Sequence, residues 1–457
     1  DPDNATAAEN HCTIIAIAPS PKDENVIWVG TDDGNLQLTH DGGKTWSNLT
    51  SKLPTVKPGS WIPYIEASKK RAGEAFVIVN DYRRNDWRPM AFFTRDFGAT
   101  WQRIVDEKKV QGHALCLVQD PEVDDLLWLG TDYGLWFSLD FGSTWNKWKD
   151  FPSVSTIDLK IHPRDHDLVI GTFGRAFWIL DDLRPLREIA RTKGKVLEKP
   201  FAAFPSPDAY LAEFRSYDGI RFDGDAVFNG ENRSPMAMLT LWVKPEVEVK
   251  MEKEKGKKEE AKTEAKAARK DAAVSLPIAV GKDTAEVKKE EKKDEKKNGK
   301  DDKVQVQIFD TQGDTVRTFS AKLDTGLVRI WWNLNQDGVR YPSRRKPKPE
   351  DDKPGGYSVL PGKYKLVFTY KGTRDSTTVT VHADPRLKIS TADLQAKQAA
   401  YDDFYKLVKV ATDGFDRLQD DFPGKVLLRR QRGHGRDEFI LHALSPWRTK
   451  KPARADF

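Results

Sequence analysis

Acidic, aromatic and arginine side chains follow short apolar runs at several points between residues 12 and 183. Such groups around one mouth could bind a sugar, a peptide or an anion, and two carboxylates at a defined separation could hydrolyse a glycosidic bond. Asp32 and Asp132 are candidates for such a pair by position. Because Asp before Gly is also what a hairpin turn prefers, an ordinary turn is the competing explanation. The candidate ligand-binding residues are Asp32, Asp33, Tyr82, Arg83, Arg84, Trp87, Asp132, Tyr133 and Arg175.

A repeated pattern predicts how these residues are positioned. The motif Ser/Thr-x-Asp-x-Gly-x-Thr-Trp occurs three times, beginning at Thr39, Thr94 and Ser138. Apolar strand-like runs such as Trp61–Ala67 and Thr156–Ile161 recur around it in four units, of which the last lacks its fourth run. A repeat of about forty to fifty residues is typical of blades. We therefore expect a mainly β chain: a partial β-propeller of three complete blades plus three strands, followed by a β-sandwich and a C-terminal helix.

The repeated motif itself is expected to be structural. Its Asp can accept hydrogen bonds from turn amides, its Gly can supply a positive φ, and its Trp can pack under the hairpin. In an up-and-down meander the turns after third strands lie on one side, and the turns after second strands lie on the other. The motif therefore falls on the opposite rim from the candidate ligand-binding residues. The structural residues are Asp41, Gly43, Trp46, Asp96, Gly98, Trp101, Asp140, Gly142 and Trp145.

The motif is similar to the Asp-box, or BNR repeat, of sialidase-type and sortilin-type β-propellers. Together with Ile27–Gly34 and Gly171–Asp182, it makes the chain resemble the C-terminal half of bacterial sortilin-like propeller proteins, which usually have His where this chain has Phe173. The segments Val306–Asp314 and Pro361–Tyr364 resemble an immunoglobulin-like module of the FlgD type. The resemblance implies a fold and no particular activity. A sialidase would need several Arg residues converging on a carboxylate and a Tyr nucleophile, and the sequence offers no matching set.

Composition divides the chain into successive segments. A stretch dominated by Lys, Glu, Asp and Ala cannot bury enough apolar surface to order itself, so it is interpreted as an insertion in the sandwich. After it, Ser390 or Thr391 is expected to cap a helix. The apolar face of this helix is expected at Leu394, Tyr401, Phe404, Leu407, Val408 and Phe415. The expected segments are 1–183 (blades), 184–235 (connection), 236–385 (immunoglobulin-like β-sandwich with the charged insertion at 244–303), 386–422 (helix) and 423–457 (basic tail).

Several classes of function are disfavoured by composition. The net charge of +5 is small beside 75 basic and 70 acidic residues, so nucleic acid is not an expected partner. There is no apolar run long enough to span a membrane. Cys12 and Cys116 are too few for a disulfide scaffold and are expected to be buried free thiols. His162 and His166 share a turn without a nearby Cys or third His, so neither a metal nor a cofactor is expected.

These observations leave three interpretations of the function. The first is a secreted or periplasmic binding and protein-interaction protein without catalysis of its own, with a glycan or peptide ligand. The alternative is the accessory half of a sialidase-like or other glycoside hydrolase, completed by N-terminal blades beyond this sequence. A third is a structural subunit whose missing blades come from a partner chain. The last two follow from the unfinished fourth unit, because residues 1–11 show no strand pattern that could complete it.

Overall fold

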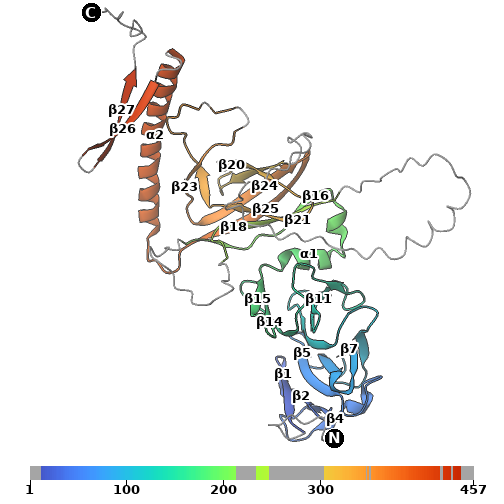
Figure 1. The fold of residues 1–457 in the computed structure, drawn as a ribbon. Coiled ribbons are helices and arrows are strands. Elements are labelled where there is room, and N and C mark those ends of the chain that lie inside the picture. Colours follow the sequence, from blue (N-terminus) through green and yellow to red (C-terminus); the bar gives the residue numbers. More distant parts are fainter. Residues whose placement is uncertain are drawn as a thin grey trace, which may run out of the picture. The chain divides into compact units, whose positions relative to one another are not determined.

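The computed structural model describes residues 12–212, 233–245, 303–345, 347–348, 351–421, 426–433 and 436–443. The chain is mainly β, as expected, and divides into two units (Figure 1). The first unit comprises Asp1–Pro207, Leu239–Gly299 and Leu323–Ile330, and the second comprises Asp208–Met238, Lys300–Lys322 and Trp331–Phe457. Among the residues described, no helix is both long and apolar enough to cross a membrane.

The first unit begins with four antiparallel meanders, which confirms the expected three complete blades plus three strands. Blade one is β1 (Ile14–Ser20), β2 (Asp23–Thr31), β3 (Leu36–Thr39) and β4 (Ser47–Asn48). Blade two is β5 (Trp61–Ala67), β6 (Ala75–Asp81), β7 (Asp86–Thr94) and β8 (Gln102–Val105). Blade three is β9 (Ala114–Gln119), β10 (Leu127–Thr131), β11 (Gly134–Ser138) and β12 (Asn146–Lys147). Blade four is β13 (Thr156–Ile161), β14 (Leu168–Thr172) and β15 (Phe177–Leu180).

Packing between neighbouring blades explains their apolar sequences. A strand between two blades is buried on both faces, and β6 is accordingly buried at every residue. Trp28 and Trp128 occupy the same register position in blades one and three, opposite Ala18 and Val118, and both are fully buried. One apolar cluster joins blades one and two, a second joins blades two and three, and a third joins blades three and four.

The Asp-box residues form the turns between third and fourth strands. In the second box, Asp96 Oδ1 accepts from the Thr94 hydroxyl at 2.8 Å and the Thr100 amide at 2.9 Å, and its Oδ2 accepts from the Thr100 hydroxyl at 2.6 Å. Asp41 and Asp140 make the same set of bonds in their own boxes. Trp101 donates to the carbonyl of Gly98, which has a φ of 74°. The bonds close the turn internally, so these carboxylates act as turn staples.

Trp145, the tryptophan of the third box, differs from the other two. Its indole Nε1 donates to the backbone carbonyl of Ile104 at 3.1 Å, whereas Trp46 and Trp101 donate within their own boxes. Ile104 belongs to β8 of blade two, so this tryptophan ties blade three to its neighbour.

The hydrogen bonds of Asp96 make the stability of the folded chain depend on pH. The Thr100 hydroxyl and amide bonds lower the pKa of Asp96 from 3.8 to about 2. Because the folded-state pKa lies below the unfolded one, this stabilisation is present above the ordinary pKa and is lost as pH falls toward about 2. We expect Asp96→Asn to unfold more readily in urea than the wild type at about pH 5, with the gap shrinking at about pH 2.5. An equal gap at both pH values would contradict this role.

The segment after blade four is more structured than a simple connection. It contains helix α1 (Arg184–Arg191), the short helix η4 (Lys195–Glu198) and strand β16 (Phe201–Ala203). Leu186, Ile189 and Ala190 of α1 are buried in the cluster that joins blades three and four. Strand β16 joins β18 (Ala237–Val243) and β21 (Gly326–Trp332) in a three-stranded sheet.

The second unit is built on a five-stranded sheet in the order β17-β25-β24-β19-β20. Its strands are β17 (Ala209–Leu211), β25 (Thr373–Ala383), β24 (Gly362–Tyr370), β19 (Lys303–Phe309) and β20 (Thr315–Lys322), and β22 (Asn335–Asp337) pairs with β23 (Gly355–Ser358). The charged insertion predicted at 244–303 lies almost entirely outside the described residues. Within the predicted basic tail, β26 (Val426–Gly433) and β27 (Arg436–Ala443) form an antiparallel hairpin that the sequence pattern did not predict.

The C-terminal helix, α2 (Thr391–Asp421), confirms the expected element and its start. Its expected apolar face is only partly correct. Val408 and Phe415 are buried, but Leu407 is 69% exposed and Phe404 is 46% exposed. Helical periodicity places apolar side chains on a common stripe, but it does not say how much of that stripe another element covers.

Candidate functional site

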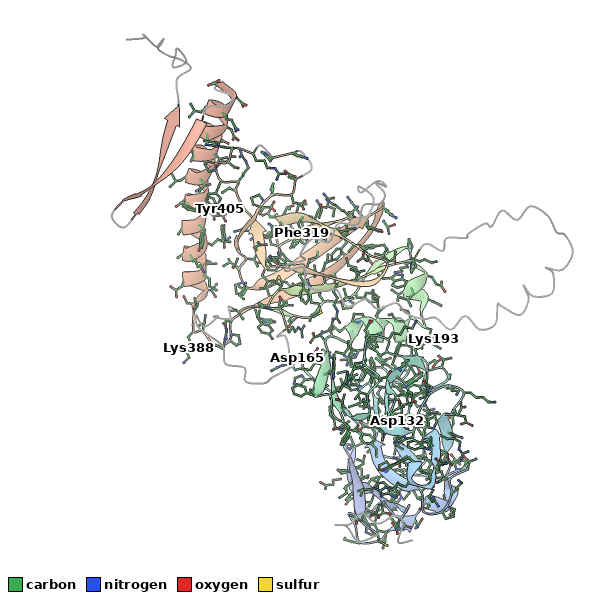
Figure 2. The ribbon with its side chains drawn as sticks, viewed as in Figure 1. Asp132, Asp165, Lys193, Phe319, Lys388 and Tyr405 are labelled. Carbon is green, nitrogen blue, oxygen red and sulfur yellow. The ribbon has the colours of Figure 1, made fainter. Side chains whose placement is uncertain are left out.

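The site lies on the rim opposite the Asp-boxes, at the junction of blades two and three. Blade two contributes Tyr82 from the short helix η3 (Tyr82–Arg84) and Trp87 from the start of β7. Blade three contributes His113, which immediately precedes β9, and Asp132, which follows β10. Figure 2 labels Asp132 among the blades of the first unit. The meander brings these four residues together because the turn after each second strand and the entry to each blade lie on the same side.

A histidine–carboxylate pair is the centre of the site. His113 Nδ1 lies 3.4 Å from Asp132 Oδ2, and the two side chains are 8% and 19% exposed. The other carboxylate oxygen, Asp132 Oδ1, is buried and has no hydrogen-bond partner among the described residues. A buried, unsatisfied carboxylate oxygen is costly unless a ligand or water completes it. Because Oδ1 packs against Gly112, any exchange of a proton or a hydrogen bond with a bound molecule falls to the other oxygen, Oδ2, which faces His113.

Two aromatic side chains surround His113. The Tyr82 ring stacks on the imidazole with centroids 5.1 Å apart, and Trp87 meets it edge-on at 5.5 Å. The Trp87 indole donates to Asn85 Oδ1 at 2.9 Å, and Asn85 adopts the left-handed conformation with a φ of 60°. This turn leaves Trp87 51% exposed, so one aromatic surface faces outward beside the pair.

The backbone at Gly112 sets the position of Asp132 and Tyr133. Its φ is 83°, and a Cβ at this residue would overlap Asp132 Oδ1 and crowd the Tyr133 ring. Asp132 and Tyr133 can pack this closely only because residue 112 is a glycine and has no Cβ. Tyr133 remains partly exposed, which adds a second aromatic surface next to the carboxylate.

The two arginines predicted for this loop have different surroundings. Arg84 donates to Asp81 Oδ1 at 2.7 Å, to the Pro58 carbonyl at 2.9 Å and to the Ser60 hydroxyl at 2.9 Å. Its guanidinium thus holds the loop in place. The guanidinium of Arg83 lies over the Trp61 ring, 3.4 Å from the centroid, where a cation–π contact orients it.

The remaining predicted binding residues do not join this cluster. Asp32 Oδ1 accepts from the amides of Cys12 and Thr13, at 3.0 and 2.7 Å, and so closes the entry to blade one. Asp33 accepts from the Thr31 hydroxyl and from Asn35 Nδ2. Arg175 is exposed on blade four, and its carbonyl accepts from Trp178 Nε1. The pairing of Asp32 with Asp132 as two catalytic carboxylates stays a prediction.

Sequence reasoning did not identify His113. The Asp132 amide donates to the His113 carbonyl as the Asp32 amide donates to that of Thr13, so the two residues are equivalent in the repeat. A histidine where another blade has threonine, directly after a glycine and before an inner strand, is the signal that could have found it.

The two cysteines differ from each other in burial. Both cysteines are free, Cys116 is buried as expected, and the expectation for Cys12 is wrong because it is exposed. It lies just before β1 begins to pair, outside the cover of the sheet. Across the described ranges, no group of three or more His, Cys, Asp or Glu is arranged to hold a metal ion.

Comparison with known proteins identifies enzymes among the similar sequences. No family model matches the chain. Xyloglucanase Xgh74A of Acetivibrio thermocellus is 27% identical over 146 residues, which is 29% of this chain and 17% of that protein. An oligoxyloglucan-reducing end-specific xyloglucanase of Emericella nidulans is 27% identical over 108 residues, 23% of this chain and 13% of that protein. The chain thus spans less than a fifth of the length of these relatives.

A solved GH74 xyloglucanase from Xanthomonas campestris is similar over 39% of this chain and 31% of its own, with 15% identity and a TM-score of 0.30. The blades of this chain are assigned from its own antiparallel sheets and not from this similarity. The neighbours are β-propeller proteins. The finer resemblances, to sortilin-like proteins and to a FlgD-type module, find no support in these comparisons.

The leading interpretation of the sequence, a binding protein without catalysis, is wrong in the light of these relatives. The relatives from Acetivibrio thermocellus and Emericella nidulans are both named as xyloglucanases, which are enzymes. The glycoside-hydrolase alternative agrees with them better. The Asp-boxes are the clearest motif of the sequence, but their residues only stabilise turns. They therefore give no indication of a catalytic activity.

Proposed function

We propose that this chain is part of a glycoside hydrolase that acts on a neutral β-glucan of the xyloglucan class, outside the cytoplasm. Asp132 is one of the two carboxylates that glycoside hydrolysis requires. The observation that carries the proposal is the His113–Asp132 pair beside the exposed rings of Trp87 and Tyr133. The names of the curated relatives supply the substrate class.

The chemistry of the site fits a sugar chain in three ways. Trp87 and Tyr133 offer aromatic faces on which the apolar face of a pyranose ring can lie. As an acid Asp132 can donate a proton to the glycosidic oxygen, and as a base it can accept one from the attacking water. His113 Nδ1 lies 3.4 Å from that carboxylate. The second carboxylate lies outside the junction of blades two and three.

A glycan panel tests the proposal. The chain is titrated with oligosaccharides from xyloglucan, cellulose, mannan and sialylated glycans, with binding followed by tryptophan fluorescence and hydrolysis by release of reducing ends. Preferential binding or cleavage of the xyloglucan set supports the proposal. Binding of sialylated glycans alone, or of no glycan in the panel, rejects it.

Trp87→Ala is expected to weaken xyloglucan oligosaccharide binding by about 10-fold, because it removes the exposed aromatic surface without removing the carboxylate. Isothermal titration measures the effect. Trp46→Ala is the matched control, since that tryptophan is 45% exposed but belongs to the first Asp-box on the opposite rim. Equal losses in both variants would show that the binding surface is elsewhere.

A further inference from the structure

The five-stranded sheet of the second unit has one buried face and one exposed face. Along β24, Tyr364, Leu366 and Phe368 are buried, while Lys363 and Lys365, which alternate with them, are exposed. The same alternation occurs in β19 and β25, the two strands on either side of β24. Because successive side chains of a strand point to opposite faces, every second residue of these strands faces solvent.

The exposed face of this sheet carries basic side chains and no acidic ones. Its cations are Lys303 of β19, Lys322 of β20, Lys363 and Lys365 of β24, and Arg374 of β25, all exposed. In the part of the chain that the structure describes, none of these five cations forms an ion pair with a carboxylate. Asp352, from a loop, accepts from the Ser320 amide and hydroxyl at 2.9 and 3.1 Å, at the outer edge of β20. In a chain with 75 basic and 70 acidic residues, this face is a local separation of charge.

The strand register brings like charges together on this face. Lys303 lies directly opposite Lys322 in the β19–β20 pair, and Lys363 and Lys365 follow each other on one side of β24. Like charges directly opposite each other in a sheet are destabilising. The fold therefore keeps a repulsion that an anionic partner would relieve, and charge complementarity identifies the kind of partner.

Hydroxyl and amide side chains occupy the positions between these cations. They include Gln305, Gln307, Thr369, Ser376, Thr378 and Thr380. The apolar members of the face, Val367 and Phe309, are only partly exposed. At the β17 edge, Tyr210 stacks on His382, which in turn pairs with Asp208. The face thus offers charge and hydrogen bonds, without a large exposed apolar side chain to enter a bilayer or a row of free aromatic rings on which nucleobases stack.

We propose that this exposed sheet face binds an acidic polysaccharide. Its carboxylates pair with the five cations, and its hydroxyl groups bond the Gln, Ser and Thr side chains between them. A polymer suits the face because the cations are spread over four strands, which lie about 4.8 Å apart, and do not converge on one point. The proposal is independent of the glycoside-hydrolase assignment, because these four strands belong to the second unit and the candidate site belongs to the first.

Two forms of one polymer test the proposal on the whole chain. Calorimetry compares polygalacturonate with the same polymer after methyl esterification, which removes the carboxylate charges and leaves the sugar hydroxyls. The acidic form should bind, the esterified form should not, and binding should weaken as salt rises from about 0.05 to about 0.5 M. Equal binding of both forms, or binding of neither, overturns the proposal. Binding of single-stranded DNA or of vesicles with anionic lipid, but not of polygalacturonate, also overturns it.

Charge-reversal variants then locate the binding surface. Lys365→Glu should weaken polygalacturonate binding by about 10-fold, because it removes a charge-assisted hydrogen bond and adds repulsion. Lys303→Glu should weaken it similarly and also raise the urea midpoint, because Lys322 then faces an opposite charge. Lys409→Glu, on an exposed position of α2, makes the same change in net charge and should bind within about 2-fold of the wild type. A rise in stability of Lys303→Glu with unchanged binding, or equal losses in Lys365→Glu and Lys409→Glu, would refute the proposal.

Discussion

Asp132→Asn is expected to lower kcat for xyloglucan hydrolysis by about 100- to 10,000-fold while leaving the affinity for xyloglucan oligosaccharides nearly unchanged. General acid or base catalysis contributes rate factors of this size, and an amide keeps the shape of the carboxylate but cannot exchange its proton. The measurement is steady-state release of reducing ends from xyloglucan, with binding followed by tryptophan fluorescence.

Asp158, a carboxylate outside the candidate site, provides the matched control for this prediction. Asp158 is on β13, its side chain is 54% exposed, and it lies 3.7 Å from Lys160 at the surface. Asp158→Asn should leave kcat and binding within about 2-fold of the wild type. If Asp132→Asn hydrolyses xyloglucan at the wild-type rate, Asp132 is not one of the catalytic carboxylates. A fall in binding equal to the fall in kcat/KM would instead assign it to substrate binding.

Arg187→Met is expected to lower the free energy of unfolding by about 3–5 kcal/mol, because it leaves the buried carboxylate of Asp120 without its cation. Arg187 is only 1% exposed, and its Nε donates to Asp120 Oδ2 at 2.8 Å. Its Nη1 donates to Glu122 Oε1 at 2.6 Å. Asp120 and Glu122 lie between β9 and β10 of blade three, so this arginine fastens helix α1 to that blade.

Urea unfolding measures this effect, and Arg191 supplies the control. Arg191 is the last residue of the same helix and also pairs with Glu122, but its side chain is 49% exposed. Arg191→Ala should therefore cost only about 0–1 kcal/mol. If the two substitutions lower the free energy of unfolding by similar amounts, burial of Arg187 does not strengthen its ion pairs.

The same cluster gives stability a second dependence on pH. Burial, with Arg184 and Arg187 adding to it, lowers the pKa of His166 below 6.5. Its Nδ1 lies 2.5 Å from Arg187 Nη1, where a neutral imidazole can accept a hydrogen bond and an imidazolium cannot. The unfolded chain therefore binds this proton more readily, and stability is lost as pH falls through 6.5. Arg187→Met should reduce that loss, since one of the charges opposing protonation is gone.

The strand pattern was the part of the fold that the sequence by itself determined. Strands β5 and β13 coincide with the predicted Trp61–Ala67 and Thr156–Ile161, and the three motifs are the turns expected of them. These features are local, because apolar runs between Gly, Asp and Asn turns specify strands and tight turns without reference to the rest of the chain. The repeat then multiplied the same local signal across four blades.

Tertiary structure alone decided which polar residues share a site. Asp32 and Asp132 occur in the same Gly-Thr-Asp motif, yet Asp32 bonds the backbone amides of its own blade, whereas Asp132 faces His113. Tyr82 and Trp87 are about thirty residues from His113, and only blade-to-blade packing brings them to it. Helix α1 shows the same limit, since eight residues carry little periodic signal. Its burial follows from an apolar surface that exists only after blades three and four have packed together.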